Sequence, residues 1–146
     1  MKLIWILIAL FSGALLPLQA GLNTRLGKSI ESPVYASLIS FVVGAFALII
    51  YIALSRQPVS WAGAMKAPSY VWLAGIMGAF YVTAVVLAFP RLGPALTFGL
   101  VVAGQMLMAV LLDHFHVLVQ QAHSFTWWRL LGILMIIGGV VIVRKF

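Results

Sequence analysis

Residues 34–54 read VYASLISFVVGAFALIIYIAL, a stretch of the chain without a single charged side chain. Because a helix rises about 1.5 Å per residue, a stretch of this length reaches about 30 Å, the thickness of the hydrocarbon core of a bilayer. Four more runs of similar length and composition follow the same pattern, so we expect five transmembrane helices. Their expected ranges are 3–22, 34–54, 70–89, 94–112 and 124–143.

The composition of the 146-residue chain also indicates an integral membrane protein. Hydrophobic residues make up 64% and charged residues 8%, which leaves too little polar surface for a soluble domain. No gap between the runs could hold such a domain, so residues 1–146 are expected to form one all-α membrane domain. The net charge of +7 does not indicate nucleic-acid binding, because Lys and Arg stand singly or in pairs at the ends of the runs. The absence of cysteine excludes disulfides and thiol chemistry.

The first run shares some features with a signal peptide. Lys2 precedes an apolar stretch, and Leu18-Gln19-Ala20 follows it at the place of a cleavage site. However, Leu18 is not the small residue that cleavage requires, and the apolar run continues beyond Pro17. We therefore expect the first run to be a membrane helix.

Positive charges are divided almost equally between the two faces that five crossings create. One face carries Lys2, Arg56, Lys66 and Arg129, and the other carries Arg25, Lys28, Arg91, Arg144 and Lys145. An unequal distribution of Lys and Arg is what normally orients a membrane protein. Without it, the chain could insert either way up. Two opposite copies could then pair as an antiparallel homodimer, which reproduces the inverted repeat of many transporters.

Polar side chains inside the apolar runs are candidates for a solute path, because an unsatisfied polar group is costly in hydrocarbon. Serine and threonine often satisfy their hydroxyls on a carbonyl of their own helix. Amides carry more donors and acceptors than one interhelical bond uses, although Gln and Asn can equally serve only to hold a bundle together, and a tyrosine can serve only to pack. We expect the following residues to line a cavity: Gln19, Asn23, Ser40, Tyr81 and Gln105.

Acidic residues are restricted to Glu31 and Asp113, which both lie outside the middle of the runs. Exchange of a cation against protons uses a carboxylate inside the membrane, so a neutral, zwitterionic or anionic solute is expected instead. Asp113 and His116 are three residues apart with His123 nearby, but such a set of weak ligands in a loop is a poor metal site, and we expect no metal. No catalytic constellation or cofactor motif is present in the sequence, so we expect neither an enzyme nor a cofactor.

Several short motifs are similar to those of a known family. They are QAGLNTRLG at 19–27, Ser32-Pro33, ISFVVG at 39–44, PRLG at 90–93, Gly104-Gln105 and DHF at 113–115. Over nearly its whole length the chain resembles the YdcZ-like small inner-membrane proteins of bacteria, which belong to the drug/metabolite transporter superfamily. The resemblance implies dual-topology homodimers, paired heterodimers or fused ten-helix forms, and it supplies no substrate. The related small multidrug resistance proteins use a glutamate in their first helix, and this chain has none there.

Taken together, these features predict a multi-pass protein of the bacterial inner membrane that transports a small polar solute. Transport would proceed by alternating access in an antiparallel homodimer, with a second copy, the solute and membrane lipids as the expected partners. The alternatives that remain open are a cation or drug exporter, one half of a heterodimer, a channel, and an assembly protein that transports nothing.

Overall fold

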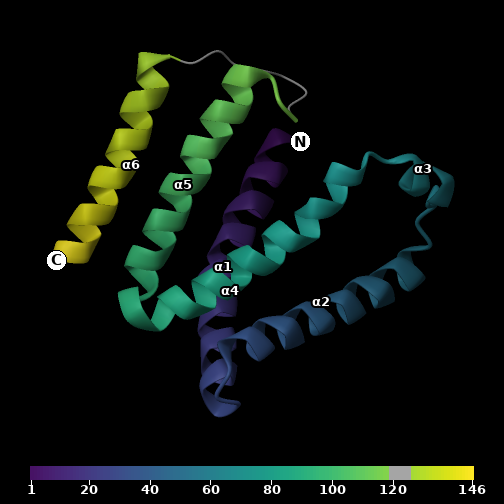
Figure 1. Ribbon diagram of the computed structural model, residues 1–146. Coiled ribbons are helices and arrows are strands. Elements are labelled where there is room, and N and C mark those ends of the chain that lie inside the picture. Colours follow the sequence, from purple (N-terminus) through teal and green to yellow (C-terminus); the bar gives the residue numbers. More distant parts are fainter. Residues whose placement is uncertain (119–125) are drawn as a thin grey trace. The chain divides into compact units, whose positions relative to one another are not determined.

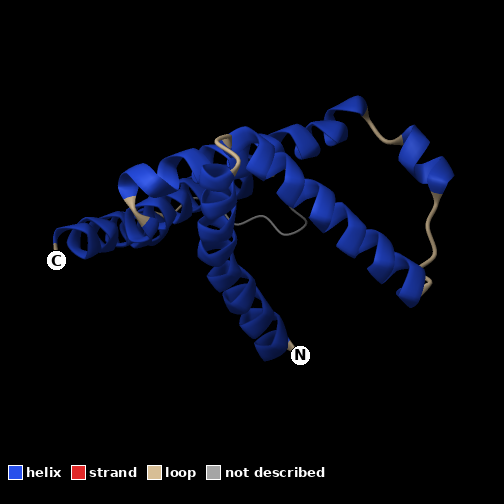
Figure 2. Cartoon of the chain, turned by 90° about the horizontal axis from the view of Figure 1, so that it is seen from below, coloured by secondary structure: helices blue, strands red, loops and turns tan. Residues whose placement is uncertain are grey.

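The computed structural model describes residues 1–118 and 126–146, and these residues form helices joined by short loops (Figure 2). The elements are α1 (Lys2–Ser29), α2 (Pro33–Ser55), α3 (Trp61–Lys66), the 3-10 helix η1 (Ser69–Trp72), α4 (Leu73–Leu92), α5 (Pro94–Phe115) and α6 (Trp127–Lys145). Five segments are long and apolar enough to cross a membrane, which are α1, α2, η1 with α4, α5 and α6. The expectation of an all-α chain with five such helices is confirmed.

The chain divides into two compact units, Met1–Pro90 and Arg91–Phe146, and each is described by itself. In the first unit α1 packs against α2, and in the second α5 packs against α6. Whether the two units act as a single membrane domain stays a prediction.

The first helix is longer than its apolar run, because it continues to Ser29 rather than ending near residue 22. A helix ends where its backbone is capped, not where its side chains stop being apolar. Pro17 lies inside α1, and the next proline is Pro33. Since a residue before proline avoids the helical region, Ser32 is extended, with φ −148° and ψ 105°.

The turn between α1 and α2 is a tight, hydrogen-bonded connection. The Ser32 N–H donates to the Gly27 carbonyl at 2.9 Å and the Glu31 N–H to the Lys28 carbonyl at 3.4 Å, with Glu31 in the left-handed region at φ 57°. This is the Schellman pattern of helix ends, with glutamate where glycine is usual. A Cβ at Gly27 would lie 3.2 Å from the Cα of Pro33, so glycine lets the two helices meet closely. From this turn α1 and α2 diverge (Figure 1).

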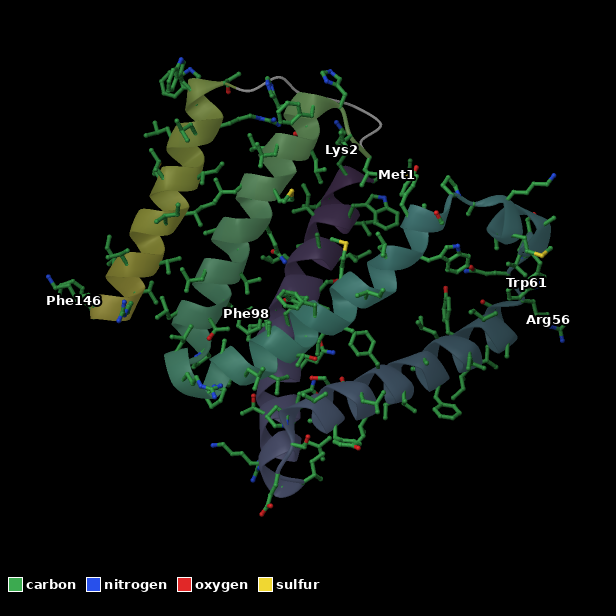
Figure 3. The ribbon with its side chains drawn as sticks, viewed as in Figure 1. Met1, Lys2, Arg56, Trp61, Phe98 and Phe146 are labelled. Carbon is green, nitrogen blue, oxygen red and sulfur yellow. The ribbon has the colours of Figure 1, made fainter. Side chains whose placement is uncertain are left out.

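Beyond α2 the chain makes a polar connection with an aromatic residue at its start. The C-cap of α2 is Arg56, which is left-handed at φ 48°, and α3 begins five residues later at Trp61; Figure 3 labels both residues. The Ser60 hydroxyl caps α3 by accepting from the Gly63 N–H at 3.1 Å. A cation and an aromatic residue that follow the end of a membrane-length helix are typical of the interface between hydrocarbon and water.

The second unit is a pair of helices that contact each other at a glycine. Gly93 has φ 78°, a conformation that permits a break before Pro94 starts α5. Further along, a Cβ at Gly99 would lie 2.5 Å from a Val140 methyl on α6. Val140 is branched at Cβ and cannot easily turn away. The packing of α5 against α6 therefore requires a residue without a side chain at position 99.

We predict that Gly99→Ala destabilises the α5–α6 pair by about 1–3 kcal/mol, the usual cost of an overpacked contact. The double variant Gly99→Ala/Val140→Ala should recover most of that loss, because the added methyl then has room. Gly104→Ala is the matched control, since a Cβ there meets nothing within 4 Å. Thermal unfolding of the purified protein in detergent measures all three, and equal melting temperatures for the Gly99 and Gly104 variants would contradict the close approach.

Candidate functional site

In the first unit an open groove lies between α1, α2 and α4, with a volume of about 540 Å³. We call it the three-helix groove, and its lining residues are Gln19, Ser40, Phe41, Gly44, Ala45, Ala47, Leu48 and Val82. Its volume falls in the range of about 300–1,000 Å³ that is usual for small-molecule sites. The walls are apolar except at two side chains, and these two are both on the predicted cavity list.

The polar part of the groove is a contact between α1 and α2. The Gln19 Nε2 donates to the Ser40 Oγ at 3.5 Å, which is the long end of the hydrogen-bond range. An amide offers two N–H donors and a carbonyl acceptor, and within the described ranges 1–118 and 126–146 Ser40 is its one recorded side-chain partner. Gln19 therefore retains most of its hydrogen-bonding capacity at the surface of the groove.

The other three predicted cavity residues lie elsewhere. Asn23 is one turn further along α1, on the buried face of that helix, and its Nδ2 is buried without a partner among the described residues. Tyr81 is half-buried on α4 beside Val82, but successive helix residues point about 100° apart, and Tyr81 is not part of the groove lining. Gln105 is an exposed residue of α5, in the second unit. The structure thus brings together Gln19 and Ser40.

Most hydroxyls inside the helices bond to their own backbone. Ser12 donates to the Ile8 carbonyl at 2.8 Å, Ser37 to the Pro33 carbonyl at 3.1 Å and Thr97 to the Gly93 carbonyl at 2.7 Å. These are the local bonds that serine and threonine favour in helices. Ser40 differs because its oxygen accepts from another helix.

The sequence interpretation missed the apolar part of the groove. On α2 the lining comes from positions 40, 41, 44, 45, 47 and 48, which share one helical face. Four of these are small residues, Ser40, Gly44, Ala45 and Ala47, and small side chains on one face leave space. The ring of Phe41 on α2 lies 3.8 Å from the point where a Cβ on Gly78 of α4 would stand, which brings α4 against the groove.

Neither acidic side chain of the sequence lies in the three-helix groove. Glu31 is in the α1–α2 turn, and Asp113 forms an ion pair with Arg129, with 2.9 Å between Oδ2 and Nη2. The pair joins the end of α5 to the start of α6. Asp113 thus has a cationic partner, and His123, the third residue of the metal ligand set considered above, lies outside the described residues.

The helices define a multi-pass membrane protein, since five segments are apolar over membrane length. The groove formed by α1, α2 and α4 is mostly apolar, with one amide at its surface. The chain belongs to the DMT_YdcZ family, described as "Putative inner membrane exporter, YdcZ", whose family model matches residues 4–142. The predicted family and the inner-membrane location are thereby confirmed, and the family is one of exporters rather than enzymes.

Comparison with curated proteins and with solved structures gave no match for this chain. The family assignment therefore comes from the family model, which covers nearly the whole chain.

We predict that exchanging the two charges of the ion pair leaves the protein at least as stable as before. Arg129 stands in the first turn of α6 and Asp113 in the last turn of α5, and both signs oppose the helix dipole, at about 0.3–1 kcal/mol each. In Asp113→Arg/Arg129→Asp the pair is retained and both charges suit the dipole. Either single substitution places like charges together and should lower the melting temperature. A double variant less stable than both single variants would contradict the pairing.

Proposed function

We propose that the chain exports a small polar solute by alternating access in an antiparallel homodimer, with the three-helix groove of each copy forming part of the solute path. The observation that carries this proposal is the Gln19 amide, which stands exposed at the groove while most of its hydrogen-bonding groups have no partner in the described chain. Family membership supplies the coarser statement, an inner-membrane exporter.

The position of Gln19 along α1 supports a role within the membrane. It lies seventeen residues after Lys2 and six before Arg25, so it is about 9 Å from the nearer charge along the helix. At that depth a polar group without a partner is costly. A partner copy, water in a cavity or a solute could each satisfy the amide.

The exposed surface of the helices supports assembly. Within the apolar stretch of each membrane-length helix, the described chain buries only between 6% and 17% of the residues. So much exposed surface leaves room for a second copy as well as for lipid. Exposed small residues, among them Gly13, Gly75 and Gly138, which have open space around them, would allow the close helix contacts that association in membranes favours.

The charge pattern supports an antiparallel arrangement of the two copies. By sequence, four Lys and Arg residues fall on one face and five on the other. Each face also carries one acidic residue, Asp113 on the first and Glu31 on the second. The net charges of the two faces therefore still differ by one. Copies inserted in opposite senses would give inward-open and outward-open states that are the same structure seen from opposite sides.

The chemistry of the groove favours a solute without a positive charge. A cation would need a carboxylate or a ring of carbonyl oxygens, and the groove lining contains neither Asp nor Glu. An amide and a hydroxyl can donate to and accept from neutral or zwitterionic polar groups. The small residues of α2 would accept the apolar part of such a solute.

We predict that Gln19→Leu lowers export by about ten- to a hundredfold, because a polar solute loses a partner worth about 1–3 kcal/mol inside the membrane. Ser40→Ala should have a smaller effect, since Gln19 retains its other groups. The measurement is efflux from vesicles that contain the purified protein and are loaded with neutral and zwitterionic metabolites. Gln57→Leu makes the same chemical change after the end of α2 and should transport normally. A solute exported equally well by wild type and Gln19→Leu would contradict this path.

We further predict that copies occur in both orientations. Because the chain has no cysteine, Phe146→Cys provides one labelling site at the C-terminus. A maleimide that does not cross membranes should label about half of the molecules from each side. Neutralising Arg144 and Lys145 with glutamine should shift this ratio, because it reverses the small excess of positive charge. Labelling from one side only in the otherwise unchanged protein would rule out the antiparallel homodimer.

A further inference from the structure

A second hollow lies at the charged end of α1, away from the groove lining. Its volume is about 290 Å³, and its lining residues are Gly21, Thr24, Arg25, Lys28, Phe89 and Pro90. We call it the α1-end pocket. Positions 21, 24, 25 and 28 form one stripe along α1, and the end of α4 covers the other side. The Phe89 ring lies 3.6 Å from the point where a Cβ on Gly21 would stand. Glycine therefore leaves room for the ring, and the end of α4 forms one wall of the pocket.

Thr24 is the unusual residue of this pocket. Its side chain is 8% exposed, and its Oγ1 is buried without a hydrogen-bond partner in the described chain. Ser12, Ser37 and Thr97 each donate to a carbonyl four residues earlier, and Thr24 makes no such bond. A buried hydroxyl is seldom left unsatisfied in proteins. This one lines a pocket, so a ligand there would be within its reach.

The other polar groups of the pocket are both cations. Arg25 and Lys28 are exposed, and no carboxylate among the described residues forms an ion pair with either of them. A guanidinium, an ammonium and a hydroxyl together provide donors in several directions. The two non-bridging oxygens of a phosphate diester share one negative charge and have lone pairs enough to accept from all three donors, and they suit the fork of an arginine.

We propose that the α1-end pocket binds a phosphate group, which at the end of a membrane-spanning helix comes from a phospholipid headgroup. Arg25 and Lys28 pair with the two non-bridging phosphate oxygens, and the Thr24 hydroxyl donates to one of the same oxygens. Phe89 and Pro90 provide an apolar wall beside the start of the acyl chains. The pocket is near the lower limit of small-molecule sites, which fits a headgroup rather than a large solute. This proposal does not depend on the transport function.

The test measures lipid retention by the purified full-length protein in a neutral detergent, by native mass spectrometry. The lipids are phosphatidylglycerol and a diacylglycerol of the same chains, which lacks the phosphate, and inorganic phosphate is added in a separate arm. Phosphatidylglycerol should be retained and diacylglycerol should not. Inorganic phosphate at millimolar concentration should compete with the lipid, since the two share the group that is recognised.

Variants at Thr24 separate a built site from general attraction to the membrane surface. Thr24→Val keeps the shape and both charges but removes the hydroxyl, and should weaken retention of phosphatidylglycerol about fivefold or more. Thr24→Ser keeps the hydroxyl and should retain the lipid. Arg25→Gln and Lys28→Gln should each weaken retention about fivefold. Arg56→Gln and Lys66→Gln, which remove cations outside the pocket, are the matched controls and should change nothing.

Three results would overturn the proposal. One is equal retention by Thr24→Val and the unchanged protein, since surface charge alone would then explain binding. Another is equal retention of diacylglycerol and phosphatidylglycerol. The third is an equal loss in the Arg56 and Lys66 controls. Direct binding of inorganic phosphate without any retention of phospholipid would support the phosphate site and overturn the lipid as its source.

Discussion

Every polar group within the hydrocarbon must find its partner inside the protein, and this constraint governs the chain from its sequence to its candidate sites. Helices satisfy the backbone, and the hydroxyls of Ser12, Ser37 and Thr97 are satisfied by carbonyls of their own helices. Among the polar groups that remain are three of α1, at Gln19, Asn23 and Thr24. These groups still need a hydrogen-bond partner, which a solute, a lipid or a second copy of the chain can supply.

The same constraint explains how much of the fold could be predicted from the sequence. Helix number and approximate position follow from the spacing of uncharged runs, because length and charge are sequence properties. The end of α1 at Ser29 does not follow, since it depends on the hydrogen bonds of the Gly27–Ser32 turn. The groove was predicted in part: the amide and hydroxyl were visible as polar residues in apolar runs, but the space beside them arises from Gly44 and Ala45 together with α4.

The residues that face each other across a helix pair could have been predicted in part from the position of the turn between the helices. In an antiparallel pair, residues equally far from the turn stand at the same height. Gln19 is eleven residues before Ile30 and Ser40 is ten after it, and these two side chains meet. Asp113 and Arg129 stand in the same relation to the gap between α5 and α6, and they form the ion pair. Height alone does not give the face of each helix, so the contacts needed the structure.

Depth along α1 separates the two sites that this helix contributes to. Gln19 is about ten residues, or about 15 Å, from the end of the helix, whereas Thr24 is about half that distance from it. A polar group deeper in the bilayer serves a molecule that crosses it, and one closer to the helix end serves a molecule that resides at the surface. In the proposed antiparallel pair each face would carry one α1-end pocket, while the two grooves would lie at similar depth. Lipid binding would then act equally on both ends of the pair and favour neither orientation, which suits a carrier whose two end states are equal in energy.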